Sequence, residues 1–327
     1  MPFPLIIDTD MAFDDWMAIA YLLACPFVDV RAMTIAATGE AHASFGVQNA
    51  LRLLALTGNR STSVAAGRPS PLRGAHAFPW FVRLAMDFRL GLTLPRPKDK
   101  ASRQTAVELL IDQLHSATQP VTVIALGPLT NLAEALLADA TLVKQIAMIY
   151  FMGGALDVPG NLAELNRRLT NPYAEWNIYI DSYAAAVVLQ SGAPITIVPL
   201  DVTNQHPLTD DFVQRCANEH STPAAHFVYR ILQRLQPLRR ANTIYFWDPL
   251  TAVIATRPEI AQFQQRHLAV IQEEGQECGR LLASAPGNPV QVCVRVDQTA
   301  FEQIFLDTLN ATPSVPPTSV PPTSGSI

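Results

Sequence analysis

Short apolar runs rich in β-branched residues alternate along the chain with segments whose apolar residues recur at helical spacing. The apolar runs predict strands over Leu5–Asp8, Val28–Ala37, Val121–Leu126, Ile146–Met152 and Ile195–Leu200. The segments between them predict helices over Trp16–Ala24, Ala43–Leu56, Ala106–Leu114, Leu132–Ala138 and Ser182–Leu189. Near-continuous apolar strands that alternate with helices are typical of a parallel sheet buried on both faces. We therefore predict an α/β fold, a single domain with a mostly parallel central sheet flanked by helices.

The later part of the chain departs from this alternation. Residues 205–247 are more polar and predict two helices, Phe212–Glu219 and Ala224–Leu235, which we interpret as a helical cap and a loop within the same domain. The segment 311–327 contains the sequence Ser-Val-Pro-Pro-Thr twice in tandem and no core-forming pattern. We predict one domain over residues 1–310 and a disordered tail over 311–327.

Composition narrows the class of protein. Charged residues make up only 16% and apolar residues 49% of the 327 residues, which predicts a large core. A net charge of −5 and a pI near 5.8 provide no basic face, so we expect no nucleic-acid partner. The four cysteines form no CxxC pair, which argues against a zinc knuckle or a dense disulfide framework. The sequence shows no signal peptide and no membrane-spanning run, so we expect a cytoplasmic protein without a membrane partner.

Acids, glycines and small polar residues follow several of the predicted strands. Ligands of parallel α/β sheets bind outside the carboxyl ends of the strands, so these segments are where we expect the chemistry. They are Asp8-Thr9-Asp10 with Asp14-Asp15, Thr38-Gly39-Glu40, Gly127-Pro128-Leu129-Thr130-Asn131 and Gly153-Gly154.

Four aspartates lie within eight residues after the first strand: Asp8, Asp10, Asp14 and Asp15. Such a group of acids is repulsive unless a cation, a proton or a helix N-terminus compensates it. Asp14 and Asp15 fit the first turn of the following helix, where the helix dipole favours acids. Carboxylate oxygens are also the ligands that Ca²⁺ or Mg²⁺ requires, and we favour a metal site over helix capping alone.

Other polar groups have a structural and a functional interpretation. Asp248-Pro249 could be no more than an ordinary helix start, with Asp as N-cap and Pro at the first helical position. Gly160-Asn161 and the segment Ala174–Asn177 could be polar surface loops, or they could bind a sugar, whose hydroxyls each donate and accept hydrogen bonds.

Taken in order, these motifs resemble the inosine-uridine-preferring nucleoside hydrolases, a family with a Rossmann-like core, from residue 4 to about residue 310. The motifs that carry the resemblance are Asp8-Thr9-Asp10 with Asp14-Asp15, Gly127–Ala133, Met152–Ala155, Gly160-Asn161, Ala174–Tyr179, Trp247-Asp248-Pro249 and Val294–Asp297. No single motif is decisive, but the ordered series is specific.

The resemblance implies a Ca²⁺ ion held by Asp10, Asp15, Asp248 and the main-chain carbonyl of Leu126. It also implies that Asp10 takes a proton from the attacking water. In this family the residues at the positions of Asp14, Asn161, Glu175 and Asn177 hold the ribose, and Met152 belongs to the same pocket. N-glycosidic cleavage passes through an oxocarbenium-like transition state, which a ring of carboxylates stabilises.

The base-binding side departs from many relatives, which carry a histidine where this chain has Trp247. This arrangement resembles the purine-preferring branch, in which two tryptophans sandwich the base. Trp247 fits this role by motif position, and Trp80 fits it approximately. Glu40 matches an acid of the same branch. His76 lies in the segment where relatives carry another histidine, and it could still reach the pocket as a proton donor.

We therefore predict a Ca²⁺-dependent hydrolase that splits purine ribonucleosides into base and ribose, with Asp10, Asn177 and Trp247 as catalytic residues. Substrate would also contact the residues Asp14, Glu40, Trp80, Met152, Asn161, Glu175 and Asp248. Two alternatives remain open at this point: a metal-dependent phosphatase with an Asp-x-Asp nucleophile, and a nucleoside- or sugar-binding relative without catalysis. We also expect a homo-oligomer, either a dimer or a tetramer.

Overall fold

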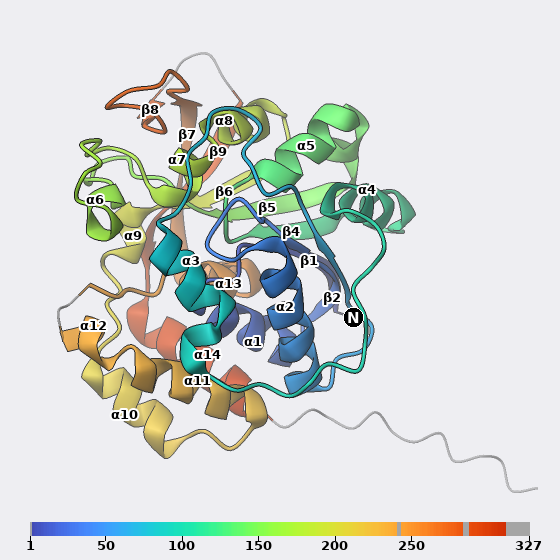
Figure 1. Ribbon diagram of the computed structural model, residues 1–327, viewed down its shortest axis with the longest axis vertical. Coiled ribbons are helices and arrows are strands. Elements are labelled where there is room, and N and C mark those ends of the chain that lie inside the picture. Colours follow the sequence, from blue (N-terminus) through green and yellow to red (C-terminus); the bar gives the residue numbers. More distant parts are fainter. Residues whose placement is uncertain (1, 241–242, 284–287, 312–327) are drawn as a thin grey trace, which may run out of the picture.

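A computed structural model describes residues 2–240, 243–283 and 288–311. Its centre is a nine-stranded sheet in the order β3-β2-β1-β4-β5-β6-β9-β7-β8 (Figure 1). Along this order, each strand from β3 to β9 pairs in parallel with the next one. Strand β7 pairs antiparallel with both β9 and β8. The strands are β1 (Phe3–Thr9), β2 (Val28–Ile35), β3 (Ser63–Ala66), β4 (Val121–Ala125), β5 (Ile146–Met152), β6 (Ile195–Val198), β7 (Ala261–Val270), β8 (Leu281–Ala283) and β9 (Pro289–Val296).

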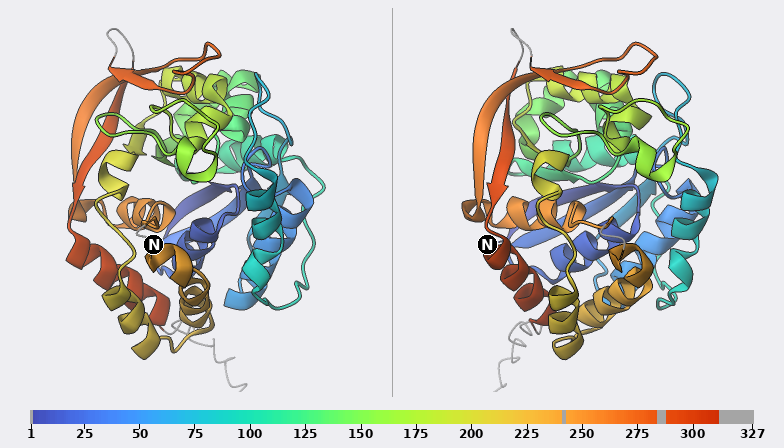
Figure 2. Two further views of the ribbon diagram at one scale, coloured as in Figure 1. Left: turned by 60° about the vertical axis from the view of Figure 1, so that its left-hand side comes forward. Right: turned by 90° about the vertical axis from the view of Figure 1, so that its left-hand side faces the viewer.

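Helices cover both faces of the sheet. Helices α1, α2, α11, α13 and α14 share one core cluster on one face, and α4, α5 and α8 share a second cluster on the other (Figures 1 and 2). The helices are α1 (Phe13–Ala24), α2 (Ala43–Thr57), α3 (Trp80–Asp87), α4 (Ala106–Ser116), α5 (Thr130–Ala138), α6 (Leu162–Leu165), α7 (Trp176–Ile180), α8 (Ser182–Gln190), α9 (Leu200–Thr203), α10 (Asp210–Asn218), α11 (Pro223–Arg234), α12 (Gln236–Arg240), α13 (Asp248–Thr256) and α14 (Gln298–Asn310).

The α/β architecture confirms the fold class predicted from the sequence. All five predicted strands and all five predicted helices between them are present, with boundaries shifted by a few residues. The prediction overlooked β3, β7, β8 and β9. Strands β3 and β8 have only four and three residues, and buried and exposed residues mix along β7 and β9. A strand that is open to solvent on one face lacks the continuous apolar run that marks a strand buried on both faces.

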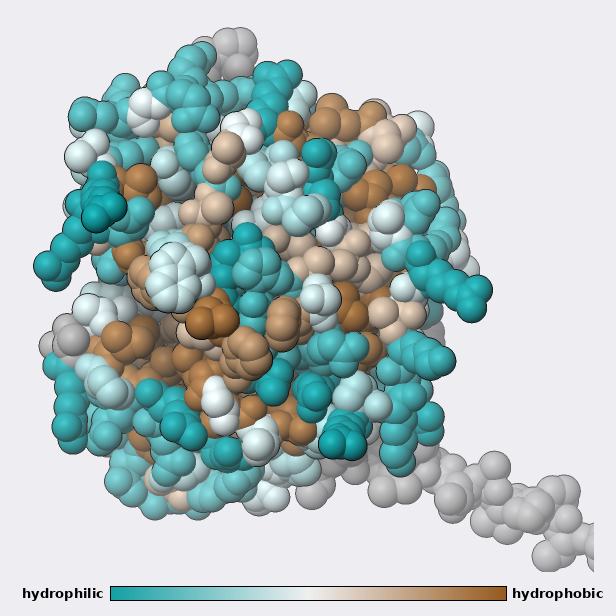
Figure 3. Space-filling model, viewed as in Figure 1, coloured by the Kyte–Doolittle hydropathy of each residue, from teal (hydrophilic) through white to brown (hydrophobic). Residues whose placement is uncertain are grey.

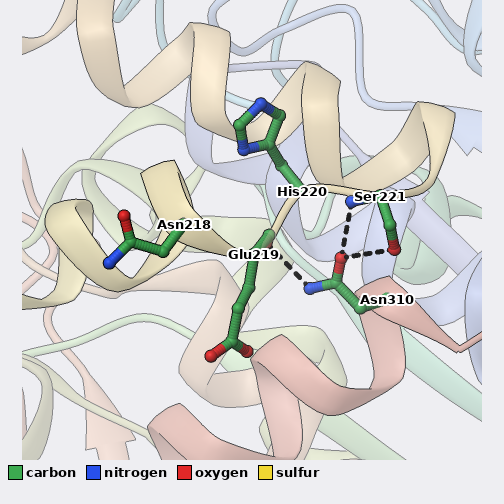
Figure 4. A pocket seen from close by; sticks show the side chains of 5 residues that line it. All are labelled: Asn218, Glu219, His220, Ser221 and Asn310. Carbon is green, nitrogen blue, oxygen red and sulfur yellow. Dashed lines mark hydrogen bonds between the residues drawn. The ribbon is translucent and has the colours of Figure 1, made fainter.

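The two helices predicted within residues 205–247 are present as α10 and α11, and α12 follows them. Apolar side chains of α10 and α11 enter the core cluster that also contains α1 and α14, and Phe212 of α10 meets Phe246 edge-on at 4.9 Å between ring centroids. Asn310 of α14 fixes the α10–α11 turn, because its amide accepts from the Ser221 N–H at 2.9 Å and donates to the Glu219 carbonyl at 3.0 Å (Figure 4). Residues 241–242 of the predicted loop and residues 312–327 of the predicted tail lie outside the described residues.

One face of the molecule is hollowed beside α3, and apolar side chains gather around this hollow (Figure 3). Phe81, Leu84 and Phe88, in and just after α3, are each about half exposed. Within the described ranges, no helix is both long enough and apolar enough to cross a membrane.

Candidate metal centre and substrate pocket

The site forms where three neighbouring parallel strands end. Asp10 follows β1, Glu40 follows β2 and Leu126 follows β4, and β1 lies between β2 and β4 in the sheet. Main-chain hydrogen bonds join these ends: the Ala41 N–H donates to the Asp10 carbonyl at 3.0 Å. The carboxylate of Asp10 accepts from the Glu40 N–H at 3.1 Å. Residues that are distant in the sequence are thereby fixed around Asp10.

Two glycines leave the space that the Asp10 side chain occupies. A Cβ atom on Gly39 would lie 2.1 Å from Oδ2 of Asp10, and one on Gly127 would lie 2.8 Å from the Asp10 Cβ. Only glycine fits at both positions without displacing this aspartate. The motif Gly127-Pro128 is therefore required by close packing against the acid.

The chain turns sharply between Asp10 and α1. Met11 is buried with a φ of 63°, a left-handed conformation that is rare for a residue with a side chain and that is often found at functional sites. Asp15 stabilises the turn by accepting hydrogen bonds from the Ala12 N–H at 3.0 Å and from the Thr9 hydroxyl. Thr9 in turn accepts from the Met11 N–H at 3.0 Å.

Three acids converge at the N-termini of α1 and α13. One carboxylate oxygen each from Asp14, Asp15 and Asp248 lies within 4.8 Å of the others, and all three residues are buried. Burial raises the pKa of Asp15 to about 7, and repulsion from Asp14 adds to this shift. Burial and the charge of Asp10 likewise raise the pKa of Asp14 to about 7.

Asp10 belongs to the same electrostatic group. Burial and the nearby Asp15 raise its pKa well above the ordinary range, and burial together with Asp14 and Asp15 does the same for Asp248. Within the described part of the chain, no Lys or Arg forms an ion pair with any of these four aspartates. Protons or a cation must therefore offset their charge, and an all-oxygen donor set fits a hard divalent cation.

Asn177 links the acid cluster to the next part of the site. Its side-chain Nδ2 donates to the carbonyl of Leu126 at 3.2 Å and to the carbonyl of Met152 at 3.0 Å. Asn177 is buried at the beginning of α7, so its amide lies beside the carbonyl that the sequence predicted as a metal ligand. The structure thus brings Leu126, Met152 and Asn177 together.

Glu175 is the N-cap of α7. Its carboxylate accepts from the N–H groups of Asn177 at 2.8 Å and Gly154 at 3.0 Å, and burial raises its pKa to about 7. The neighbouring half-buried Asn161 accepts from the Trp176 N–H at 3.2 Å. Close packing of Gly160 on Ala174 holds the two motifs together, because a Cβ on Gly160 would lie 2.1 Å from the Ala174 carbonyl oxygen.

Trp247 lies next to Asp248 and forms an aromatic wall with two neighbours. Its ring meets Phe13 at 6.3 Å and Tyr245 at 5.8 Å between ring centroids, and it packs with Met152 in one apolar cluster. The indole Nε1 of Trp247 is buried and has no hydrogen-bond partner among the residues that the structure describes. Phe13 and Tyr245 were not predicted from the sequence, since nothing marks them there as site residues.

Trp80 and His76 lie in surroundings that differ from those of Trp247. Trp80 is 75% exposed at the beginning of α3, and its ring meets only that of Phe81 among the described aromatic pairs. Both ring nitrogens of His76 have partners, the Tyr179 carbonyl at 2.8 Å and the Glu274 carboxylate at 3.0 Å. In this arrangement His76 does not present a free nitrogen to a substrate.

Glu40 lies close to the acid cluster, as its position after β2 predicts. Burial and repulsion from Asp10 and then Asp14 raise the pKa of its carboxyl group well above the ordinary range. Arg83 of α3 approaches the same strand end, where its guanidinium donates to the Ala37 carbonyl at 2.9 Å and the Ala41 carbonyl at 3.3 Å. No sequence motif marks Arg83 as a site residue, because only the packing of α3 brings it to this edge.

Asp8 has a structural environment distinct from that of the other aspartates. Its Oδ1 accepts from the Thr34 hydroxyl at 2.6 Å and from the Asn131 amide at 2.8 Å, and burial raises its pKa to about 7. A Cβ on Gly67 would lie 1.8 Å from the amide oxygen of Asn131, so this network is also tightly packed. Asp8 therefore ties β1 to β2 and α5.

A mostly parallel sheet with buried carboxylates grouped at its carboxyl edge is the arrangement of an α/β protein with a ligand site at the strand ends. The family model described as inosine-uridine preferring nucleoside hydrolase matches residues 5–303, and the chain belongs to this family. It is therefore a nucleoside hydrolase, an enzyme that cleaves the N-glycosidic bond of ribonucleosides. This assignment removes the phosphatase alternative.

Individual relatives agree on the family and differ in the preference that their names state. The chain is 38% identical to the pyrimidine-specific ribonucleoside hydrolase RihA of Photobacterium profundum, over 79% of this chain and 81% of the relative. It superposes on a plant nucleoside hydrolase, PpNRh1, with a TM-score of 0.84 at 30% identity, covering 95% of this chain and all of the other. A purine-preferring ribonucleoside hydrolase from Gardnerella vaginalis gives a TM-score of 0.79 at 25% identity, covering 94% and 98%.

Proposed function

We propose that this nucleoside hydrolase prefers purine ribonucleosides and uses a Ca²⁺ ion. The observation that carries the proposal is the position of Trp247, which forms an aromatic wall directly beside the buried acid cluster. The ion would be held by Asp10, Asp15, Asp248 and the Leu126 carbonyl. When bound, Ca²⁺ offsets the charge of the cluster and favours the deprotonated form of the attacking water.

Asp10 is the group that we assign to accept the proton of the attacking water. Its carboxylate is held by the Glu40 N–H and by the space that Gly39 and Gly127 leave, so its position is fixed before substrate binds. In the reaction the bond between the anomeric carbon and the base nitrogen breaks while a bond from the water oxygen to that carbon forms. The departing base takes up a proton as it leaves.

The ribose side of the pocket is assigned to Asp14, Asn161, Glu175 and Asn177. Both N–H groups of the Asn177 amide are engaged by main-chain carbonyls, so its oxygen is left to accept from a ribose hydroxyl. Glu175 is fixed by main-chain donors at the start of α7 and places negative charge beside this amide. Such charge stabilises an oxocarbenium-like transition state.

The base side is assigned to Trp247, with Met152 beside it and Glu40 at the end of β2. A purine offers a larger stacking surface to an indole ring than a pyrimidine does, and the absence of a histidine before Asp248 favours proton uptake from solvent. We also assign Trp80 to the second face of the base. This assignment requires a shift of α3, because the Trp80 side chain is exposed in its present position. Pyrimidine preference is the competing assignment, and the name of the RihA relative favours it.

A nucleoside panel tests the proposal. We expect kcat/KM on inosine and guanosine to exceed that on uridine and cytidine by tenfold or more, measured as released ribose. Chelator should abolish turnover, and added Ca²⁺ should restore it. Faster cleavage of uridine than of inosine would overturn the purine assignment without affecting the family. Full activity in chelator would overturn the metal assignment. Nucleoside binding without ribose release would support the non-catalytic alternative. A homo-oligomer in the cytoplasm stays a prediction, which sedimentation and cell fractionation would test.

A further inference from the structure

We propose that His76, Glu274 and Cys278 form a second metal site, selective for a borderline divalent ion such as Zn²⁺ and separate from the acid cluster. His76 lies in the segment between β3 and α3, and the other two residues lie in the segment between β7 and β8. One ligand atom from each residue lies within 4.8 Å of the other two. A nitrogen, an oxygen and a sulfur donor thus meet at one point.

The main chain sets the orientation of the His76 ring. Nδ1 lies 2.8 Å from the carbonyl oxygen of Tyr179, which can only accept a hydrogen bond, so Nδ1 carries a hydrogen. The ring also stacks on that of Tyr179, with centroids 4.0 Å apart and planes 11° apart. A histidine whose one nitrogen donates to a carbonyl is held in the tautomer that offers the other nitrogen to a metal.

The second ring nitrogen of His76 faces a carboxylate. Nε2 lies 3.0 Å from an oxygen of Glu274, and a carboxylate also only accepts. A hydrogen, carried by the ring or by the carboxyl group, or a metal ion must therefore lie between these two atoms. Zinc bonds of about 2.0 to 2.3 Å in a tetrahedral site separate neighbouring ligand atoms by about 3.3 to 3.8 Å. The observed separation of 3.0 Å is close to this range.

Cys278 supplies the donor that sets the metal preference. It is buried at 1% exposure, and burial together with the nearby Glu274 and Glu273 raises the pKa of its thiol. Its loop is held against the segment that precedes α7, since the Asn171 amide donates to the Cys278 carbonyl at 2.7 Å. A Cβ on Gly279 would lie 3.0 Å from the Tyr179 Cα. Thiolate with imidazole suits Zn²⁺, whereas Ca²⁺ and Mg²⁺ take oxygen ligands.

Binding would connect three segments of the chain. The ion would join the segment before α3, the segment after β7 and, through Tyr179, helix α7, which also carries Asn177. On binding, the thiol proton of Cys278 leaves to solvent and Nε2 of His76 binds without a proton. The side chain of Glu274 is 66% exposed, so the fourth position is open to water. The expected consequence is a stiffer wall on the ribose side of the pocket.

Cobalt titration tests the site in the full-length enzyme with the acid cluster saturated by Ca²⁺. We expect one Co²⁺ per chain with a thiolate-to-cobalt absorption band, displacement by Zn²⁺, and a higher melting temperature with Zn²⁺. Cys278→Ala should remove the band, and His76→Ala should weaken Co²⁺ binding by about tenfold or more. Cys216→Ala, which removes another buried thiol in α10, is the matched control and should keep the band.

The outcome separates this site from the first one. Asp248→Ala should leave the thiolate band unchanged, because Asp248 belongs only to the acid cluster. A wild-type protein without the band, or a Cys278→Ala protein that retains it, would overturn the proposal. If Cys278→Ala has a lower melting temperature in chelator, Cys278→Ser provides the second test, since Ser preserves the volume and removes the sulfur.

Discussion

The side chain of Asp10 occupies the space that a β-carbon on Gly39 would need, since that atom would lie 2.1 Å from Oδ2 of Asp10. The two residues follow neighbouring strands, β1 and β2, and the Glu40 N–H fixes the same carboxylate oxygen. The glycine and the aspartate are therefore one structural unit. A substitution at Gly39 acts on the assigned general base without changing any charge.

Gly39→Ala should lower both stability and turnover. The added methyl group must displace the Asp10 carboxylate, and overpacking of this kind costs about 1 to 3 kcal/mol in the free energy of unfolding. We expect kcat/KM to fall by about 100-fold, because a misplaced catalytic group loses that much. Gly58→Ala is the control: Gly58 ends α2 with a φ of 74° and has open space, so it should cost stability without loss of turnover. Equal kcat/KM values for Gly39→Ala and Gly58→Ala would refute the link between Gly39 and the position of the Asp10 carboxylate.

Asp10→Asn should lower kcat by about 1000-fold or more while the fold remains intact. The change removes the assigned proton acceptor and a metal ligand, and each contributes a large factor to the rate. Steady-state kinetics with inosine and circular dichroism measure the two effects. Asp29→Asn, which alters a surface acid paired with Arg31, should behave as wild type. Activity of Asp10→Asn within tenfold of wild type is incompatible with the assignment.

Trp247→Ala should separate purine from pyrimidine substrates. Loss of a stacked aromatic contact costs about 1 to 3 kcal/mol, so kcat/KM on inosine should fall by about tenfold to 100-fold, with a smaller loss on uridine. Trp247→Phe should recover part of the purine activity, because it retains a stacking ring. Equal losses on both substrates would return Trp247 to a packing role beside Met152.

The metal-free protein should lose stability as the pH rises from about 4 to about 7. Burial raises the pKa of Asp14 and Asp15 to about 7, with repulsion from Asp10 adding to the shift of Asp14 and repulsion from Asp14 adding to that of Asp15, whereas both titrate near 4 in the unfolded chain. Between these values the folded chain binds more protons than the unfolded chain, so the free energy of unfolding decreases with rising pH. Urea unfolding in chelator at pH 5 and pH 8 measures the difference.

Two comparisons test the cause of this pH dependence. Added Ca²⁺ should remove most of the loss of stability at pH 8, because it offsets the charge of the ionised carboxylates. Asp15→Asn should have a weaker dependence on pH in chelator, since one of the raised groups is gone. A chelator-treated wild type that is more stable at pH 8 than at pH 5 contradicts the electrostatic account of the cluster.

The sequence by itself determined the fold class and predicted most of the candidate site residues. Apolar runs predict buried parallel strands because such strands are covered on both faces, and the segments after them hold the chemistry because parallel strands end at one edge. Asp10, Asp14 and Asp15 were predicted from the acids that follow the first strand, and Asn177 and Asp248 were predicted only through the resemblance of the ordered motifs. Strands β3, β7, β8 and β9 were missed, because β3 and β8 are short and the half-open faces of β7 and β9 give no continuous apolar run.

Only the tertiary structure decided which side chains meet across long distances in the chain. Arg83 reaches the end of β2 and His76 meets Glu274 because of how α3 and two loops pack, and no short pattern records such contacts. The exposed position of Trp80 has the same origin, since it depends on where α3 lies. Local sequence sets backbone propensity and the period of burial, but the distance between atoms far apart in the chain follows from the packing of the whole fold.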